Sequence, residues 1–211
     1  GAGIEKAEKA EESDCVIINT CSVRKTAENR IWGRLSFYGH LKKSRKDYKI
    51  IVTGCMAERL GEELKKECSF VDAVIGTNSK MDIVDLLSKG KTEEREGYTF
   101  TSSYYREGEF SSYVPIMNGC NNFCSYCIVP YVRGREVSRS VDDVLSEIRR
   151  LDSLGVREIT LLGQNVNSYF YEGVTFPMLL EKVVRELDNI EFVRFESPHP
   201  KDFSPELIRV I

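Results

Sequence analysis

Three cysteines lie close together in the middle of the chain, at Cys120, Cys124 and Cys127. Cysteine thiolates bind soft metal ions and iron–sulfur clusters. Because a 4Fe-4S cluster has four irons, three thiolates leave one iron open to a small molecule that binds through nitrogen and oxygen. The spacing therefore predicts a 4Fe-4S cluster with one open iron on this loop.

Two other kinds of metal site can use closely spaced cysteines. A zinc knuckle and an electron-transfer ferredoxin cluster each need a fourth Cys or His nearby. His40 and His199 are distant in the sequence, and no fourth cysteine follows within the loop. A non-catalytic iron–sulfur module for electron transfer remains the alternative of another class, and a ligand at the open iron would distinguish the two.

The complete set of cysteines also indicates the compartment. The chain has 211 residues and seven cysteines, an odd number, with no secretion signal in sight, which argues against a disulfide framework. We therefore expect a cytoplasmic protein in which Cys15 and Cys68 are small buried hydrophobic residues. No apolar run approaches the roughly 20 residues that a membrane helix needs, so we expect no membrane association.

Strands and helices alternate in the first part of the chain. Short β-branched runs predict strands at 16–20, 50–53 and 71–75. Helices are expected between and after them, at 23–43, 57–66 and 80–87. Continuous apolar strands that alternate with helices predict a parallel sheet covered on both faces. In such a sheet Cys21 and Cys55, which follow successive strands, lie at one edge, and Cys15 and Cys68 lie at the other.

The second part repeats the pattern after a polar stretch at 91–112, which predicts a linker with one strand at 98–101. Strands are expected at 113–117, 158–162 and 192–196. Helices are expected at 141–154, where Gly155 ends the helix, and from Pro177 and Pro205 onward. Three strand–helix units cannot close a barrel of six or eight strands, so we expect a partial (β/α) barrel, with the cysteine loop after its first strand.

The charge is unevenly distributed along the chain. Residues 24–49 contain nine basic and two acidic residues, a net charge of +7 within a chain whose net charge is −3. Such a basic face can bind phosphates. A solvated helix face is the alternative interpretation.

Several separated motifs resemble the radical S-adenosylmethionine (SAM) methylthiotransferase family. The motifs are Gly119 to Arg139 around the cysteine triad, Ile18 to Arg24, Gly54 to Ala57, Leu162 to Tyr169 and Pro198-His199-Pro200. The last two are similar to the tRNA branch of the family, MiaB. The branch that modifies a ribosomal protein side chain, RimO, and the branch that acts on threonylcarbamoyl adenosine are the alternatives.

The resemblance implies an α/β chain in three parts. Residues 1–90 would form a flavodoxin-like, parallel-sheet methylthiotransferase domain that lacks its first strand. Residues 91–112 would be the linker, and residues 113–211 the first part of a radical SAM (β/α) barrel.

The resemblance also implies two 4Fe-4S clusters. Cys120, Cys124 and Cys127 would bind the cluster at which SAM is cleaved to a radical. Cys21 and Cys55 would be two ligands of an auxiliary cluster that carries the methylthio group, whereas the family's Gly-Cys-Gln-Met-Asn motif, with the third ligand, is absent from the sequence. The implied reaction inserts a methylthio group at carbon 2 of a prenylated adenosine beside the tRNA anticodon.

The remaining expectations concern contacts and partners. Tyr126, Gln164, Asn165 and Glu196 are candidate SAM-binding residues. Loop packing is the alternative for Tyr126, and turn capping is the alternative for Gln164 and Asn165. Arg133, Arg135 and Arg139 could meet RNA phosphate or the SAM carboxylate. No catalytic side chain is assigned. The expected partners are the anticodon stem-loop of tRNA and an electron donor such as flavodoxin, and we expect this chain alone to be inactive.

Overall fold

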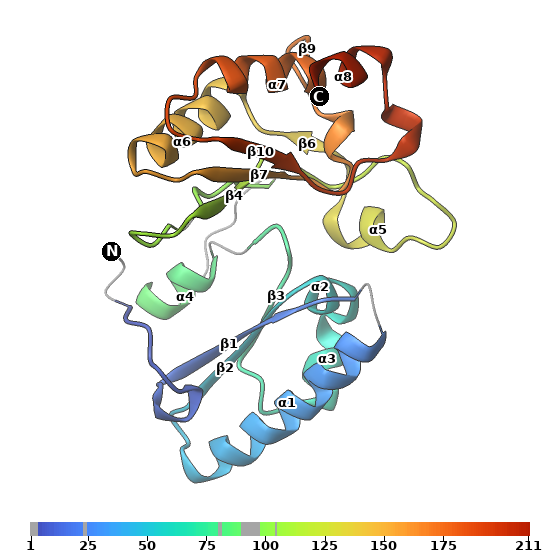
Figure 1. Cartoon of the computed structure of the whole chain (residues 1–211). Coiled ribbons are helices and arrows are strands. Elements are labelled where there is room, and N and C mark those ends of the chain that lie inside the picture. Colours follow the sequence, from blue (N-terminus) through green and yellow to red (C-terminus); the bar gives the residue numbers. More distant parts are fainter. Residues whose placement is uncertain (1–3, 23–24, 80–81, 90–97, 104) are drawn as a thin grey trace. The chain divides into compact units, whose positions relative to one another are not determined.

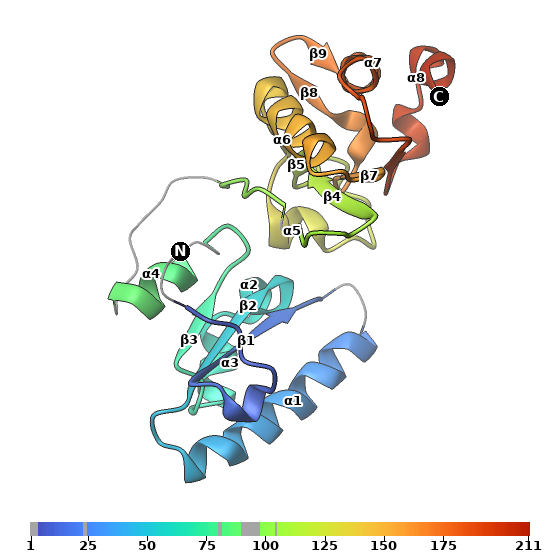
Figure 2. The same ribbon diagram turned by 60° about the vertical axis from the view of Figure 1, so that its left-hand side comes forward.

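The computed structural model describes all residues except 1–3, 23–24, 80–81, 90–97 and 104. The chain divides into two compact units, and each contains its own parallel sheet (Figures 1 and 2). The first unit consists of Gly1–Thr99 and Cys124–Arg133. The second consists of Phe100–Phe123 and Gly134–Ile211.

The first unit is built on a three-stranded parallel sheet in the order β1-β2-β3. The strands are β1 (Cys15–Thr20), β2 (Lys49–Gly54) and β3 (Ala73–Ile75). The helices are α1 (Lys25–Ser44), α2 (Cys55–Leu60), α3 (Glu62–Glu67) and α4 (Asp82–Lys89). Each strand is followed by helical structure, as predicted, because β-branched runs alternate with longer amphipathic stretches.

The central strand β2 buries side chains on both faces of this sheet. Ile50 and Val52 pack in one core cluster with side chains of α1, α2 and α3. Ile51, which points to the other face, packs with Ile83 of α4. A strand covered on both sides needs a continuous apolar sequence, and Lys49–Gly54 has one. The first unit is therefore a parallel sheet with helices on both faces, as expected.

The second unit contains a parallel sheet in the order β10-β7-β4. Its strands are β4 (Ser111–Pro115), β7 (Glu158–Leu162) and β10 (Phe192–Phe195). Its larger helices are α6 (Val141–Ser153), α7 (Phe176–Arg185) and α8 (Pro205–Val210). Short elements complete the described chain: β5 (Met117–Asn118), α5 (Val129–Arg133, in the first unit), β6 (Val137–Ser138), β8 (Phe170–Tyr171), β9 (Val174–Thr175) and the 3-10 helices Ala10–Glu12, Val166–Ser168 and Pro200–Asp202.

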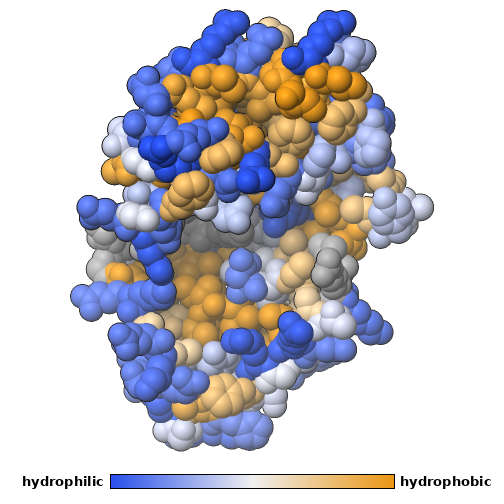
Figure 3. All heavy atoms as spheres, viewed as in Figure 1, coloured by the Kyte–Doolittle hydropathy of each residue, from blue (hydrophilic) through white to orange (hydrophobic). Residues whose placement is uncertain are grey.

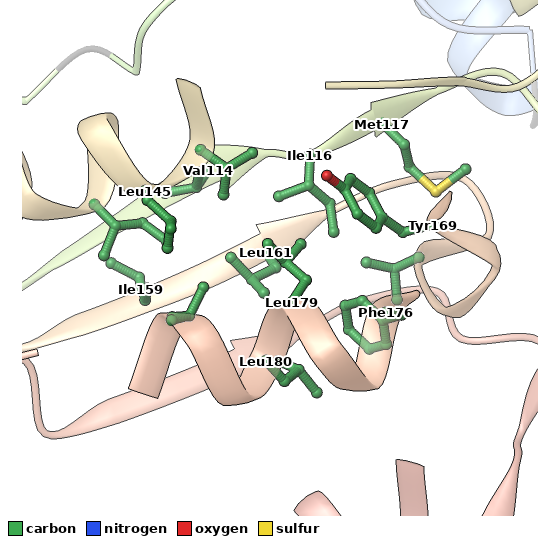
Figure 4. Close-up of a cluster of buried hydrophobic side chains, with 14 of the residues drawn as sticks. Val114, Ile116, Met117, Leu145, Ile159, Leu161, Tyr169, Phe176, Leu179 and Leu180 are labelled. Carbon is green, nitrogen blue, oxygen red and sulfur yellow. The ribbon is translucent and has the colours of Figure 1, made fainter. Parts of the chain in front are cut away.

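A single large core joins this second sheet to its helices. Figure 4 shows Val114, Ile159 and Leu161 of the strands facing Leu145 of α6 and Leu179 of α7. All five are buried. The core therefore anchors the carboxyl ends of β4 and β7, the edge from which the cysteine loop and the Gln164 segment emerge.

The structure corrects several details of the predicted elements. Residues 98–101 form no strand. The helix expected at 57–66 is two helices, since Gly61 between them has a φ of +47°. The strand expected at 113–117 ends at Pro115, and Met117 pairs with Ser138 in a separate antiparallel ladder. The first residues of the helices expected at 23–43 and 80–87 lie outside the described part of the chain.

On the face shown in Figure 3, apolar side chains gather in patches with hydrophilic ones around them. On the second unit, Met178, Val184 and Ile208 are exposed on α7 and α8. Within the described residues, no helix combines the length and the apolar composition needed to span a bilayer.

Candidate metal centre

The cysteine loop begins at Gly119, directly after β5. Gly119 has a φ of +83°, and a Cβ atom built on it would lie 2.1 Å from the carbonyl oxygen of Arg135. Only glycine permits this backbone conformation and this close approach together. The N–H of Cys120 then donates to the carbonyl of Gly134 at 3.2 Å. The first cysteine is thus fixed by backbone contacts to the segment that follows the loop.

Gln164 connects the loop to the sheet. It lies two residues beyond the end of β7, and its Oε1 accepts a hydrogen bond from the N–H of Gly119 at 2.6 Å. The carboxyl edge of a parallel sheet is where α/β folds place their ligands. The Gln164 side chain therefore holds the backbone at Gly119, directly before Cys120.

The motif Leu162 to Tyr169 is hydrogen bonded to the motif Pro198-His199-Pro200. The Nδ2 of Asn167 donates to the carbonyl of His199 at 2.9 Å, and the N–H of His199 donates to Asn167 Oδ1 at 2.8 Å. Asn165, which is 1% exposed, donates to Asp202 at 2.7 Å. Lys201 reaches the cysteine loop and donates to Asn122 Oδ1 at 2.8 Å. The segments after β7 and β10 and the cysteine loop therefore form one hydrogen-bonded group within the second unit.

The candidate SAM-binding residues differ in accessibility. The Tyr126 side chain is 88% exposed, and Glu196 is also exposed. Gln164 is half-buried and Asn165 is buried, and both are already hydrogen bonded within the second unit. Tyr126 and Glu196 are thus accessible to solvent, whereas the Gln164 side chain binds the backbone of Gly119 and the Asn165 side chain binds the Asp202 carboxylate.

The three cysteines of the triad differ in burial. Cys120 is 7% exposed, and Cys124 and Cys127 are half-buried. The N–H of Cys127 donates to the carbonyl of Cys124 at 2.9 Å, which closes a tight turn between them. Cys120 belongs to the second unit, whereas Cys124 and Cys127 lie in the segment Cys124–Arg133 that packs with the first.

The donor set of the loop suits an iron–sulfur cluster in its chemistry. None of the seven cysteines is in a disulfide, and cysteine sulfur is the usual ligand of iron–sulfur clusters. Among the described residues, no three His, Cys, Asp or Glu side chains converge as a ready metal-binding group. The Nδ2 of Asn122 is buried without a hydrogen-bond partner in the described chain, and such a donor suits the anionic sulfur of a cluster.

Arg139 has an internal role that the sequence analysis did not predict. Its side chain is 8% exposed and pairs with Glu147, which is 4% exposed. Glu147 also accepts a hydrogen bond from the N–H of Ser103 at 2.5 Å. The expectation that Arg139 meets RNA phosphate or the SAM carboxylate is wrong, because a buried ion pair already uses its guanidinium group. Arg135 lies over the Phe123 ring at 4.3 Å, within the second unit.

Cys21 and Cys55 each follow the carboxyl end of a strand at the same edge of the first sheet. Thr20 and Gly54 are paired at the ends of β1 and β2, and a cysteine directly follows each of them in the sequence. Gly54 has a φ of +95°, and a Cβ there would lie 2.3 Å from the carbonyl oxygen of Thr20. The Thr20 hydroxyl donates to the carbonyl of Thr53 at 2.6 Å. It also accepts the N–H groups of Met56 and Ala57, each at 3.2 Å, in the first turn of the helix that Cys55 begins.

The other two cysteines lie away from this edge, as predicted. Cys15 pairs with Lys49 at the opposite end of β1, where the structure makes it the first residue of the strand. Cys68 is buried in the core cluster beneath α1 and α3. Burial raises the pKa of the Cys15 and Cys68 thiols, which disfavours the thiolate form that a metal requires.

A buried threonine connects α2 to the segment that carries Cys124 and Cys127. Glu58 of α2 accepts the N–H of Thr77 at 2.8 Å, and Thr77 Oγ1 donates to the carbonyl of Val132 in α5 at 2.7 Å. Thr77 is 2% exposed. The helix that begins at Cys55 and the helix that follows Cys127 are therefore linked through one residue of the first unit, Thr77, whose N–H binds Glu58 and whose hydroxyl binds Val132.

Comparison with known proteins agrees with this arrangement. Residues 114–211 match the radical SAM superfamily, and residues 1–76 match uncharacterized protein family UPF0004. In structure the chain is similar to a radical S-adenosylmethionine methyltransferase, TsrM, from Kitasatospora setae. The TM-score is 0.61 at 14% identity, over 93% of this chain and 46% of that one. The fold and the cysteine loop thus define a radical SAM protein.

Curated relatives narrow the family further. Proteins named tRNA-2-methylthio-N(6)-dimethylallyladenosine synthase are 48% identical in Treponema denticola and 47% in Treponema pallidum, over 99% of this chain. The relative of that name in Bacteroides fragilis is 45% identical over 100% of the chain. The chain belongs to the radical SAM methylthiotransferase family and is MiaB-like. It spans about half the length of these relatives, 52%, 51% and 49% respectively.

Proposed function

We propose that this chain is part of a tRNA methylthiotransferase that inserts a methylthio group at carbon 2 of a prenylated adenosine beside the anticodon. The observation that supports it most directly is the cysteine loop held by Gln164 at the carboxyl edge of the second sheet. The substrate follows from the relatives, which carry the name of a tRNA-2-methylthio-N(6)-dimethylallyladenosine synthase.

In this proposal Cys120, Cys124 and Cys127 hold a 4Fe-4S cluster. When bound, such a cluster supplies the electron that cleaves SAM to a 5′-deoxyadenosyl radical. The chain's own residues hold the loop: Gly119 allows the close backbone approach, and Gln164 fixes the amide before Cys120. Tyr126 and Glu196 are exposed and would contact SAM, and Gln164 and Asn165 would hold its methionine group by hydrogen bonds.

Cys21 and Cys55 would be ligands of a second, auxiliary 4Fe-4S cluster. The parallel register brings their backbones side by side at one sheet edge. Two thiolates need at least one further ligand to hold a cluster of this type. We therefore expect a weaker second cluster, and no methylthiolated adenosine, from this chain alone. An electron donor such as flavodoxin and a cytoplasmic location complete the proposal.

Anaerobic reconstitution with iron and sulfide tests the proposal. We expect iron and sulfide uptake, a reduced-state electron paramagnetic resonance signal that changes when SAM is added, and formation of 5′-deoxyadenosine. The Cys124→Ala variant should lose the SAM-sensitive signal, whereas Cys68→Ala, which removes a thiol buried in the core, should keep it. An intact cluster signal that SAM leaves unchanged would contradict the proposal and favour the electron-transfer module.

A further inference from the structure

The basic residues of and after α1 fall into two groups in the structure. Lys42 is tied to Asp72 and donates to the carbonyl of Phe70 at 3.0 Å. Arg45 lies over the Tyr48 ring at 5.2 Å and near Asp14. These two cations hold the fold of the first unit together. Other basic residues of α1, including Arg30 and Arg34, are exposed.

Arg30, Arg34 and Phe37 share one face of α1, and we call these three residues the α1 face. Their spacing of four and three residues places them in a row along a helix of 3.6 residues per turn. The buried side of the helix lies about a third of a turn away, with Leu35 and Tyr38 in the core. The α1 face therefore points away from the first unit's core.

Phe37 makes this face unusual. Its side chain is 52% exposed, although its ring lies edge-on to Tyr38 with a centroid separation of 5.2 Å. Neither Arg30 nor Arg34 has an ion pair with another described residue. An exposed aromatic ring in line with two exposed guanidinium groups is the combination with which proteins bind single-stranded nucleic acid, through base stacking and phosphate contacts.

We propose that the α1 face docks a single-stranded stretch of RNA, with a base stacked on Phe37 and phosphates bound by Arg30 and Arg34. Charge complementarity indicates an anionic partner, since the Arg30 and Arg34 guanidinium groups are exposed and have no ion pair within the described part of the chain. The exposed ring distinguishes RNA from an acidic protein, because unpaired bases offer flat stacking surfaces. The inference rests on the RNA part of the proposed function and needs no cluster.

Fluorescence anisotropy with a labelled RNA hairpin that has a single-stranded loop measures this docking directly. We expect the Arg30→Glu/Arg34→Glu variant to bind about 10-fold or more weakly, and the slope of log affinity against log salt to fall by about 1 to 2. The control is Lys66→Glu/Lys182→Glu, which reverses two exposed charges elsewhere and changes the net charge equally. Equal losses in both double variants would overturn the proposal.

Phe37 provides the second arm of the experiment. We expect Phe37→Ala to weaken RNA binding roughly 5- to 100-fold, as removal of a stacking ring does, whereas Phe37→Tyr should bind as the parent does. Circular dichroism and thermal unfolding confirm that each variant folds. Retained affinity in folded Phe37→Ala would overturn the proposal.

A competitor separates stacking from charge alone. Poly-glutamate is a polyanion like RNA but has no bases. It should therefore compete poorly with the hairpin at matched charge concentration. Equal competition would identify a general acidic-partner surface and contradict RNA docking. Because all three readouts are binding measurements on the unloaded protein, their failure leaves the cysteine chemistry of the proposed function untouched.

Discussion

Asn167 and His199, which are 32 residues apart in the sequence, exchange two hydrogen bonds through the Asn167 amide and the His199 backbone. The Asn167 side-chain amide therefore binds both the N–H and the C=O of His199, as the backbone of a neighbouring strand does in a sheet. Both residues belong to motifs that resemble the tRNA branch of the family. In the structure these motifs fix the arrangement of loops at the carboxyl edge of the second sheet.

The first prediction follows from this pair. Asn167→Ala leaves the partly buried N–H and C=O of His199 without partners, so we expect a loss of about 2 kcal/mol in the free energy of unfolding. His199→Ala is the control, since both bonds use its backbone and its ring only accepts the N–H of Lys201 at 3.2 Å. Urea unfolding of the two variants measures the difference, and equal losses would contradict the assignment.

The second prediction concerns Gly119. An alanine there adds a Cβ within 2.1 Å of the Arg135 carbonyl and strains a φ of +83°. We expect Gly119→Ala to retain much less iron after reconstitution, because the backbone before Cys120 must move. Gly134→Ala is a matched control, since Gly134 has a φ of +77° but its Cβ would meet nothing within 4 Å. Its strain of about 1 to 2 kcal/mol should leave iron binding intact.

The third prediction separates the cysteines of the first unit. We expect Cys21→Ala and Cys55→Ala each to lower the iron content of the reconstituted protein, because both thiols lie at the carboxyl edge of the sheet. The double variant Cys15→Ala/Cys68→Ala should bind as much iron as the parent. Iron and sulfide assays together with Mössbauer spectra measure this, and iron loss confined to the Cys15/Cys68 variant would exclude the proposed auxiliary site.

The fourth prediction concerns acid stability through Asp152. Burial of Asp152 opposes its ionisation, but the N–H groups of Asn189 and Ile190, each at 2.8 Å, outweigh burial and lower its pKa. Because the folded pKa lies below the unfolded value of about 3.9, the stabilisation is complete above that pH and is lost as the pH falls through the folded pKa.

Urea unfolding at several pH values tests this dependence. At neutral pH we expect Asp152→Asn to cost about 2 kcal/mol, the contribution of hydrogen bonds to a charged group. The difference between parent and variant should shrink as the solution becomes more acidic than about pH 4. Asp188→Asn serves as the control, because the exposed Asp188 contributes only its backbone N–H, at 3.3 Å. If the difference in unfolding free energy between parent and Asp152→Asn did not change with pH, the stabilisation would not come from the ionised form of Asp152.

The sequence predicted the strands of the two parallel sheets, but not the side-chain contacts that support the cysteine loop. The reason is physical. Glu158–Leu162 is found as predicted, and Cys21 and Cys55 follow successive parallel strands, because apolar runs and helix signals are local in the sequence. The helix Val129–Arg133 was missed, since Pro130 within a short apolar run is equally typical of a loop. The bond from Gly119 to Gln164 spans 45 residues and depends on tertiary packing, which no local pattern encodes.

The Thr20 hydroxyl has a consequence for how iron would enter the first unit. One oxygen atom binds the carboxyl end of β2 and the first turn of α2, so the backbones at Cys21 and Cys55 are held together by the protein alone. A zinc finger, by contrast, depends on its metal to fold. The first unit should therefore stay folded when iron is removed, because its sheet and helix are held by hydrogen bonds of the protein itself.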